Sequence, residues 1–530
     1  MAGYELICVI TISLMAGVIN ILHIIIGAAK TQPGFTYLGV GHFYLDYFEY
    51  LQQIVQGMRG RWSVINQFTI NDPTQTIFGW EQYLLIGKWG KIFNFSPIFT
   101  YWFSVFILTF ILSFLIFLII KEILKEYSFV IQFFSFVLTL LIAPLVKITW
   151  EMGKIKIIPF DFWYAPISFF HRFGGIPHHL LASILTILVM ILTAQLLERK
   201  KIELKKFGLK TSLIILILAA LLTFAPFQVI NLMSAIVFVT IINQIRLFRL
   251  NTWFLPILVI VVIFPLALVI KHSHDLSPLF IRAIAWEKIQ QHHPPLLLIL
   301  ATVGPIIFFV PFGLKTYFKK ITQLKLLLFA YFIFSYTYFF SPLAEFFGTF
   351  NLRFLTPVVY VFYGVVGFLG VMNFVKIIET GWIRKMIITL IFVYCFTIQI
   401  IIFSSFSVDR LSYIPNGVME AFTFLNKQKD NKSVLTAPDM SLGVILPSYA
   451  DKNVYLGRTI FTPDFENKSN ISDRFFKGVM SIEEANVLLK ENNIGYVILT
   501  SMENYLPGSL KNYSLKEIYK NKDATVWEVN

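Results

Sequence analysis

Long apolar runs recur along the first three quarters of the chain, separated by short polar stretches. Each run has about the length that an α-helix needs to cross the hydrocarbon core of a bilayer, roughly 20 residues. A segment in lipid must also satisfy its backbone hydrogen bonds internally, and a helix does so within one run. The sequence therefore predicts a polytopic α-helical membrane protein.

Composition agrees with this fold class. Of the 530 residues, 57% are hydrophobic and 14% are charged, whereas soluble domains carry about 25% charged residues. The formal net charge of +14 comes from Lys and Arg in short loops beside the apolar runs, where topology rules place them. Nucleic acid is therefore not expected as a partner. Cys8 and Cys395 both lie inside apolar runs, so no disulfide framework or cysteine metal cluster is predicted.

Eleven spans can be drawn from the runs, and basic residues such as Lys121 and Lys315 follow every second one. The positive-inside rule then places the N-terminus in the cytoplasm of a multi-pass plasma-membrane protein. The fifth and sixth spans are short, which suits either a re-entrant pair or two thin, tilted helices. The spans are 4–28, 98–120, 129–147, 177–197, 211–226, 228–245, 253–271, 295–314, 326–341, 355–376 and 386–405.

Composition changes at residue 406, where Asn, Lys, Asp and Ser increase and the apolar residues come in short bursts. Strand and helix patterns alternate there, which is typical of a small α/β domain. We therefore expect a transmembrane domain over 1–405, with 31–97 as its first extracytoplasmic loop, and an extracytoplasmic α/β domain over 406–530. The tail pattern predicts helices at 416–427 and 481–493, and strands at 433–436, 453–456, 495–500 and 524–529.

The first outer loop carries acidic residues directly beside the membrane. Asp46, Glu49 and Gln53 are spaced i, i+3 and i+7, so a helix over 44–58 puts them on one face. Gly57 and Gly60 are expected to end that helix. Carboxylates at a membrane surface are costly unless solvated or paired, which makes Asp46 a functional candidate. A helix that simply lies in the membrane interface is the structural alternative.

Two further outer loops supply basic candidates. Arg172 and His178 lie before and at the start of the span 177–197, and Arg353 precedes the span 355–376. His178 and His179 are adjacent, whereas zinc ligands on a helix are spaced i and i+4, so no zinc site is expected. The planar guanidinium of Arg353 suits a phosphate, and the alternative is an anchor that reaches the lipid headgroups.

Several short motifs extend from the first loop to the tail. They comprise Asp46, Tyr50, Gln53, Gly57, Gly60 and Trp62; Pro177-His178; Arg353 before Pro357; and Val454, Gly457, Thr462, Pro463, Asp464 and Phe465. With these residues the chain resembles the GT-C glycosyltransferases, and most of all uncharacterised bacterial multi-span members related to protein O-mannosyltransferases. The resemblance touches most of the chain, although each motif is short.

The resemblance implies transfer of a sugar from a polyprenyl-phosphate donor to a hydroxyl of a glycan, lipid or protein acceptor. It implies a hexosyl or pentosyl transferase that inverts the anomeric carbon, with Asp46 as general base and Glu49 as second choice. Cationic and polar groups would bind the substrate and its phosphate: Arg353, Arg172, His178 and Gln53. The loop lacks a paired acidic doublet, which leaves open a divalent cation and assigns no metal ligand.

Two other functions fit a multi-span chain. A transporter or flippase of a lipid-linked or small polar substrate places its site near the midplane and often shows internal repeats. Here the ionisable groups are concentrated outside the spans, which favours chemistry at the membrane surface. A non-catalytic envelope assembly protein would use the tail to bind a partner, and the tail contains no recognisable catalytic signature.

Overall fold

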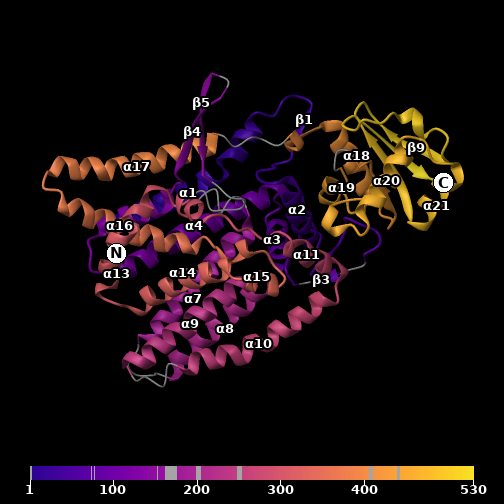
Figure 1. Ribbon diagram of the computed structural model, residues 1–530. Coiled ribbons are helices and arrows are strands. Elements are labelled where there is room, and N and C mark those ends of the chain that lie inside the picture. Colours follow the sequence, from indigo (N-terminus) through magenta and orange to yellow (C-terminus); the bar gives the residue numbers. More distant parts are fainter. Residues whose placement is uncertain are drawn as a thin grey trace. The chain divides into compact units, whose positions relative to one another are not determined.

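The computed structural model describes residues 3–72, 75–76, 78–151, 153–160, 176–198, 204–247, 253–404, 410–438 and 442–530. The chain forms two compact units (Figure 1). The first unit contains Met1–His23, Ser104–His272 and Glu287–Ser407. The second contains Ile24–Phe103, Ser273–Trp286 and Val408–Asn530. The first loop and the tail therefore belong to one compact unit, although they lie far apart in the sequence.

The first unit is built from long apolar helices. Among the described residues, eight helices are long and apolar enough to cross a membrane, which confirms the predicted polytopic helical fold. They are α1 (Gly3–Ala29), α4 (Pro97–Ile123), α7 (Pro177–Leu197), α9 (Pro226–Leu247), α10 (Phe254–Asp275), α14 (Gln323–Phe340), α16 (Val358–Ile377) and α17 (Gly381–Ser404).

The other three expected spans differ from the drawn runs. The run 129–147 forms only α5 (Phe129–Leu141), since Pro144 disfavours helix in the residue before it. The run 295–314 divides into α12 (Leu296–Ala301), η2 (Gly304–Phe309) and α13 (Val310–Lys319). Pro305 has no N–H to donate, so one helical hydrogen bond is missing there. The fifth run lies in α8 (Leu204–Phe224). The count of eleven spans stays a prediction.

Helix α16 forms the centre of the first unit. It contacts α5, η2, α13 and α14, and nearly all its side chains from Val358 to Val371 are buried. A helix that is apolar on all sides needs such surroundings. The short elements α15 (Leu343–Phe346) and η3 (Asn351–Phe354) precede it, and a hairpin of β4 (Val146–Glu151) and β5 (Lys154–Pro159) follows α5.

The second unit begins with the first loop. Its elements are β1 (Phe35–Tyr37), α2 (Tyr44–Met58), β2 (Val64–Ile65), β3 (Gln75–Thr76) and α3 (Glu81–Ile92), with most of α11 (Pro278–Lys288) packed in the same unit. Helix α2 has the bounds expected from the sequence. It ends in a Schellman motif: Gly60 N–H donates to the carbonyl of Gly57, and Arg61 N–H donates to that of Gln56. Gly60 has φ +96°, which explains the glycine there.

Gly57 has a different role from the expected one. It lies inside α2, where a Cβ would stand 2.2 Å from the carbonyl oxygen of Leu84 in α3. Reciprocally, a Cβ on Gly87 of α3 would stand 2.0 Å from the carbonyl oxygen of Ile54. The backbones of α2 and α3 therefore touch at two glycines. The expectation that Gly57 ends the helix was wrong, because close packing and not chain reversal requires glycine there.

Gly57→Ala is expected to destabilise the second unit. The added methyl meets backbone atoms of α3, which cannot rotate away, so the helices must separate at a cost of about 1–3 kcal/mol. Gly208→Ala is the matched control, because a Cβ on this helical glycine meets nothing within 4 Å. Thermal unfolding of both variants in nanodiscs should show a lower midpoint for Gly57→Ala alone. Equal midpoints would contradict the close α2–α3 contact.

The tail forms the α/β fold expected of it. Its four-stranded sheet has the order β7-β8-β10-β9, in which β7 and β8 are parallel and the other pairs antiparallel. Phe475, Phe476, Val497 and Trp527 lie in its buried core. The elements are β6 (Tyr413–Pro415), α18 (Asn416–Lys427), β7 (Ser433–Leu435), α19 (Leu442–Ile445), α20 (Phe465–Phe476), α21 (Ile482–Glu491), β8 (Ile494–Thr500), β9 (Leu515–Lys520) and β10 (Ala524–Val529).

Individual tail elements follow the sequence unevenly. Ser481 caps α21 and exchanges hydrogen bonds with Glu484, as the Ser-x-x-Glu pattern predicts. The segment 453–456 is no regular strand and contributes one bridge, between Val454 and Val434. Helix α20 and strand β9 were not expected. Strand β1 pairs antiparallel with β6, so the first loop and the tail share backbone hydrogen bonds.

Candidate functional site

The two candidate carboxylates lie at the beginning of α2. Asp46 is in its first turn and Glu49 follows three residues later. Their side chains are 18% and 7% exposed, so the helix holds both away from bulk water. A carboxylate in such surroundings needs a charged or hydrogen-bonded partner. The second unit supplies one from the tail.

Arg458 joins the two carboxylates. Its Nη2 lies 2.5 Å from Oδ1 of Asp46, and its Nη1 pairs with Oε2 of Glu49. Both carboxylates thus lie on one face of α2, as their spacing predicts. The Arg458 side chain is only 9% exposed. Burial lowers the pKa of its guanidinium and the negative charge of Asp46 opposes this, so the group stays protonated near neutral pH.

Arg458 was missed by the sequence reasoning. It directly follows Gly457, at a position that the quoted tail motif leaves undefined. The motif residues around it build the turn that presents it: Thr462 Oγ1 donates to the carbonyl of Phe68 at 2.8 Å and accepts from Gly457 N–H at 3.2 Å. The available signal was a basic residue, Arg458, inside a motif of turn and apolar residues. A buried arginine requires a carboxylate partner, so its position indicates an acid nearby in the fold.

A second ion pair supports the same turn. Arg282 of α11 donates from Nη2 to Oδ2 of Asp72 at 2.6 Å, and from Nε to the carbonyl of Ile460 at 3.1 Å. The Asp72 side chain is 1% exposed, and Asn66 Nδ2 donates to the carbonyl of Phe461 at 2.9 Å. Residues of the first loop and of α11 therefore hold the backbone that follows Arg458.

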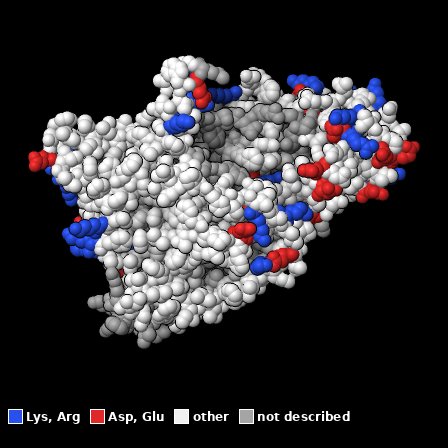
Figure 2. Space-filling view, viewed as in Figure 1, with Lys and Arg blue, Asp and Glu red and all other residues white. Residues whose placement is uncertain are grey.

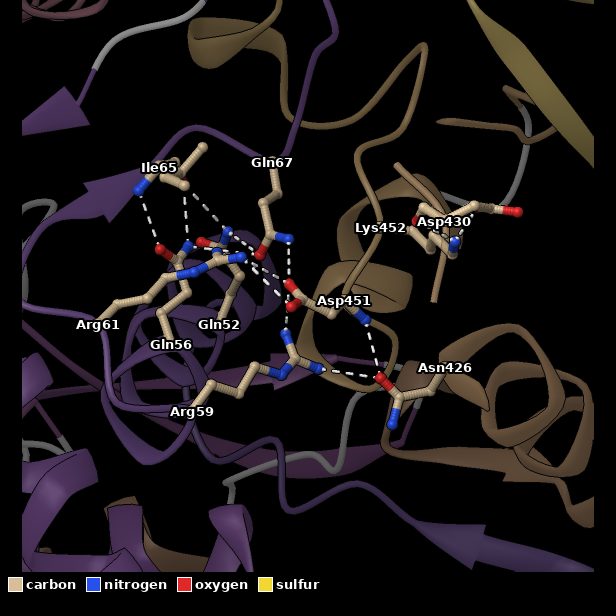
Figure 3. Close-up of polar contacts among 10 residues, drawn as sticks. All are labelled: Gln52, Gln56, Arg59, Arg61, Ile65, Gln67, Asn426, Asp430, Asp451 and Lys452. Atoms are coloured by element: carbon tan, nitrogen blue, oxygen red, sulfur yellow. Dashed lines mark hydrogen bonds and ion pairs between the residues drawn. The ribbon is translucent and has the colours of Figure 1, made fainter. Parts of the chain in front are cut away.

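Figure 3 shows a third set of contacts, between the first loop and the tail, centred on Asp451. Its Oδ1 accepts from Arg59 Nη1 at 3.1 Å, from Arg61 Nη2 at 3.0 Å and from Gln67 Nε2 at 2.9 Å. The Asp451 side chain is 40% exposed, and ion pairs in contact with water contribute little stability. The cluster instead fixes how the loop after α2 lies on the tail.

Two buried polar side chains lie beside the carboxylates along the chain. His42 precedes α2, and its Nε2 lies 2.8 Å from the hydroxyl of Tyr101. Burial lowers the pKa of His42 to about 4 and the nearby Asp46 opposes this, so the imidazole is neutral near pH 7. Within the described residues, His42 Nδ1 and Gln53 Oε1 have no hydrogen-bond partner. Gln53 lies on α2 two turns after Asp46.

The remaining predicted residues belong elsewhere. Arg353, in η3, pairs with Oε1 of Glu287 at 2.7 Å, and Thr349 Oγ1 donates to Oε2 of the same carboxylate at 2.6 Å. His178 lies in the first turn of α7, with its ring 4.2 Å from that of His179. Both Arg353 and His178 are in the first compact unit, whereas Asp46, Glu49 and Gln53 are in the second. Arg172 lies outside the described residues.

The carboxylate pair is arranged for a guanidinium. In the described part of the chain, no group of three or more His, Cys, Asp and Glu side chains could hold a metal ion. Asp46 and Glu49 contribute two carboxylates, and both are engaged by Arg458. The cluster therefore carries one net negative charge, and its more exposed member is Asp46. Such a group can accept a hydrogen bond or a proton from a hydroxyl.

Comparison of the sequence with protein-family profiles and with curated proteins gives no match. Solved structures do match the fold. The apo oligosaccharyltransferase of Archaeoglobus fulgidus superposes with a TM-score of 0.59 at 11% identity, over 99% of this chain and 74% of that one. ArnT from Cupriavidus metallidurans, bound to undecaprenyl phosphate, gives 0.55 at 10% identity, over 100% and 98% of the two chains.

A third solved structure covers a smaller part of a larger protein. The arabinofuranosyltransferase AftD from Mycobacteria matches with a TM-score of 0.55 at 11% identity, over 100% of this chain and 40% of that one. Another structure of the A. fulgidus enzyme is a complex with Zn and sulfate, with a TM-score of 0.55 at 12% identity, over 95% and 70% of the two chains. At this level of identity the likeness establishes a shared fold.

Proposed function

The chain has the fold of the GT-C glycosyltransferase superfamily, and we propose that it is a membrane glycosyltransferase. It transfers a sugar from a polyprenyl-phosphate donor to an acceptor hydroxyl on the extracytoplasmic face, with Asp46 as the general base. The observation that carries this proposal is the buried cluster of Asp46, Glu49 and Arg458 at the beginning of α2. Asp46, the more exposed of its two carboxylates, belongs to the loop in which the resemblance expects the base, and this supports the proposal.

The solved structures of this fold support the class of donor. ArnT from C. metallidurans is bound to undecaprenyl phosphate, and the A. fulgidus oligosaccharyltransferase forms a complex with an inhibitory peptide and a dolichol-phosphate. A polyprenyl tail requires a membrane-embedded enzyme, while its sugar phosphate requires polar groups at the membrane surface. A chain that combines spanning helices with a polar first loop meets both requirements.

The proposed step is an in-line displacement at the anomeric carbon. The acceptor oxygen forms the new bond to that carbon, and the bond from the carbon to the phosphate oxygen breaks. Polyprenyl phosphate leaves with the electron pair, and the acceptor proton ends on a carboxylate oxygen of Asp46. Attack from the side opposite the phosphate inverts the anomeric configuration. Hexose and pentose donors both fit this scheme.

Glu49 and Arg458 have positioning roles in this proposal. Arg458 contacts Oδ1 of Asp46, which fixes the rotamer of the base and leaves Oδ2 to face the acceptor. Glu49, the more buried acid, also pairs with Arg458 and offsets its charge. The single cation is thus shared between Asp46 and Glu49.

Binding of the donor phosphate involves the other candidates. Arg353, whose guanidinium Glu287 orients, is proposed to bind the phosphate, and Arg172, His178 and Gln53 are the other proposed substrate- or phosphate-binding residues. A divalent cation accompanies one solved structure of this fold, as Zn with sulfate. The proposed step assigns the proton transfer to Asp46 and names no metal ligand, and a divalent cation stays open for this chain.

Transfer assays with defined donors test the proposal. The purified full chain in nanodiscs is incubated with radiolabelled polyprenyl-phosphate sugars and a membrane extract as acceptor. Label is expected to move from the lipid to an acceptor as polyprenyl phosphate is released. If the labelled lipid crosses the bilayer of proteoliposomes intact and no transfer occurs with any donor, the transporter function replaces the glycosyltransferase.

A further inference from the structure

The β4–β5 hairpin of the first unit presents an exposed apolar face. Its strands pair antiparallel, with Ile148 opposite Ile157 and Trp150 opposite Ile155. Successive side chains of a strand point to opposite faces, so these four lie on one face. Ile148, Trp150 and Ile155 are 68%, 71% and 64% exposed. A two-stranded hairpin with its apolar face in water is marginally stable at best, so this face needs a cover.

The opposite face of the hairpin is basic. There Thr149 lies opposite Lys156 and Glu151 lies opposite Lys154, with Lys147 further along β4. Glu151 pairs with Lys156 at 3.0 Å, which leaves an excess of positive charge. In Figure 2, charged side chains on the hairpin stand above a helical flank that shows almost no charge. Lysine and tryptophan are the side chains that favour the boundary between headgroups and acyl chains.

The hairpin is fixed to the C-terminal half of a membrane helix. At its base, Tyr394 of α17 donates its hydroxyl hydrogen to the carbonyl of Pro144 at 2.9 Å. Gln399 of α17 donates from Nε2 to the carbonyl of Ile142 at 3.0 Å. Tyr394 lies just past the middle of α17 and Gln399 lies closer to its end at Ser404, so the base of the hairpin packs on the C-terminal half of this span.

The hairpin leaves the first unit across the direction of α17. In Figure 1, β4 and β5 extend across the direction of α17 and away from the helices of the first unit. Helix α17 is one of the candidate membrane spans, and an element that leaves its C-terminal half across its direction runs parallel to the membrane plane. We propose that the hairpin lies in the membrane interface, with Ile148, Trp150, Ile155 and Ile157 toward the acyl chains and its lysines bound to anionic lipid phosphates.

Spin labels on the two faces test this placement. In a chain with Cys8→Ser and Cys395→Ala, single cysteines replace Ile148, Trp150, Ile155 or Ile157 in one set and Lys147, Thr149, Lys154 or Lys156 in the other. Each labelled full-length variant is placed in nanodiscs containing phosphatidylglycerol, and its accessibility to oxygen and to a water-soluble nickel chelate is measured. Labels of the apolar set are expected to be accessible to oxygen, and labels of the basic set to the nickel chelate. The two kinds of accessibility should therefore alternate along each strand.

Every other result overturns the proposal. Nickel access at all eight positions would place the hairpin in water, and exclusion of both reagents from the apolar set would indicate a protein or a second copy as the cover. A label at Val479, an exposed tail residue, should be accessible to nickel in every sample and serves as the water-exposed reference. Phosphatidylcholine discs should reduce the depth at which the labels of the apolar face lie in the bilayer. The combined Lys147→Gln, Lys154→Gln and Lys156→Gln variant should reduce this depth as well. Unchanged depth in both would contradict the binding of anionic lipid.

Discussion

Asp46→Asn is expected to reduce the rate of sugar transfer by about 10²–10⁴-fold, the usual contribution of a general base. The amide has the shape of the carboxylate but cannot accept the proton of the acceptor hydroxyl. Arg458 keeps its pair with Glu49 in this variant, so the fold of the cluster should survive. Initial rates with a single polyprenyl-phosphate sugar, measured beside the thermal unfolding midpoint, separate a catalytic loss from a structural one.

Two other carboxylates serve as controls for this result. Asp451→Asn removes an acid of the same compact unit that also faces arginines but is 40% exposed, and it should leave transfer near the wild-type rate. Glu49→Gln should lower the rate less than Asp46→Asn, since Glu49 acts through Arg458. Intact transfer by Asp46→Asn together with a large loss in Glu49→Gln would make Glu49 the base and Asp46 the positioning residue.

Arg458→Met is expected to be the most destabilising change in the cluster. It removes the cation and leaves the buried Glu49 carboxylate beside the partly exposed Asp46 carboxylate, and breaking a buried pair costs about 3–5 kcal/mol. The unfolding midpoint of the second unit should fall accordingly, and transfer should fall with it. The double variant of Arg458→Met with Glu49→Gln should recover part of the stability, because only one buried charge then remains.

A matched arginine distinguishes this effect from a general loss of charge. Arg474 pairs with Glu484 in the tail, and both side chains are about half exposed, at 49% and 52%. Arg474→Met should therefore leave the unfolding midpoint nearly unchanged. If Arg458→Met is equally mild, or if Glu49→Gln gives no recovery in the double variant, the buried pairing of Arg458 with both acids is refuted.

Most helices could be predicted because their signals are local. An apolar run of sufficient length can satisfy its backbone only as a helix in lipid, so α7 and α16 follow their runs closely. Helix α2 was bounded correctly, since Gly60 takes the left-handed conformation that ends it. The run 295–314 is not one continuous helix but three shorter pieces, and the proline inside this apolar run is the local signal for that break.

The sequence predicted the two acids of the candidate site but not the arginine that pairs with them. The spacing of Asp46 and Glu49 indicates a shared face, and the structure agrees, because both reach one guanidinium. The guanidinium itself comes from a residue more than 400 positions away in the chain, and no local pattern links such positions. The roles of these residues in catalysis, and those of Arg353, Arg172, His178 and Gln53, stay predictions for the assays above.

The sequence by itself determined the membrane class of this protein, most of its helices, the α/β character of its tail and the place of an acidic pair on one helical face. Only the tertiary structure decided that Arg458 neutralises one of the two acids, that Gly57 and Gly87 let α2 and α3 touch, and that the first loop and the tail form one compact unit. The physical reason is one of range. Helix periodicity and turn chemistry act over a few residues, whereas the pairing of a buried charge depends on which distant segments the folded chain brings together.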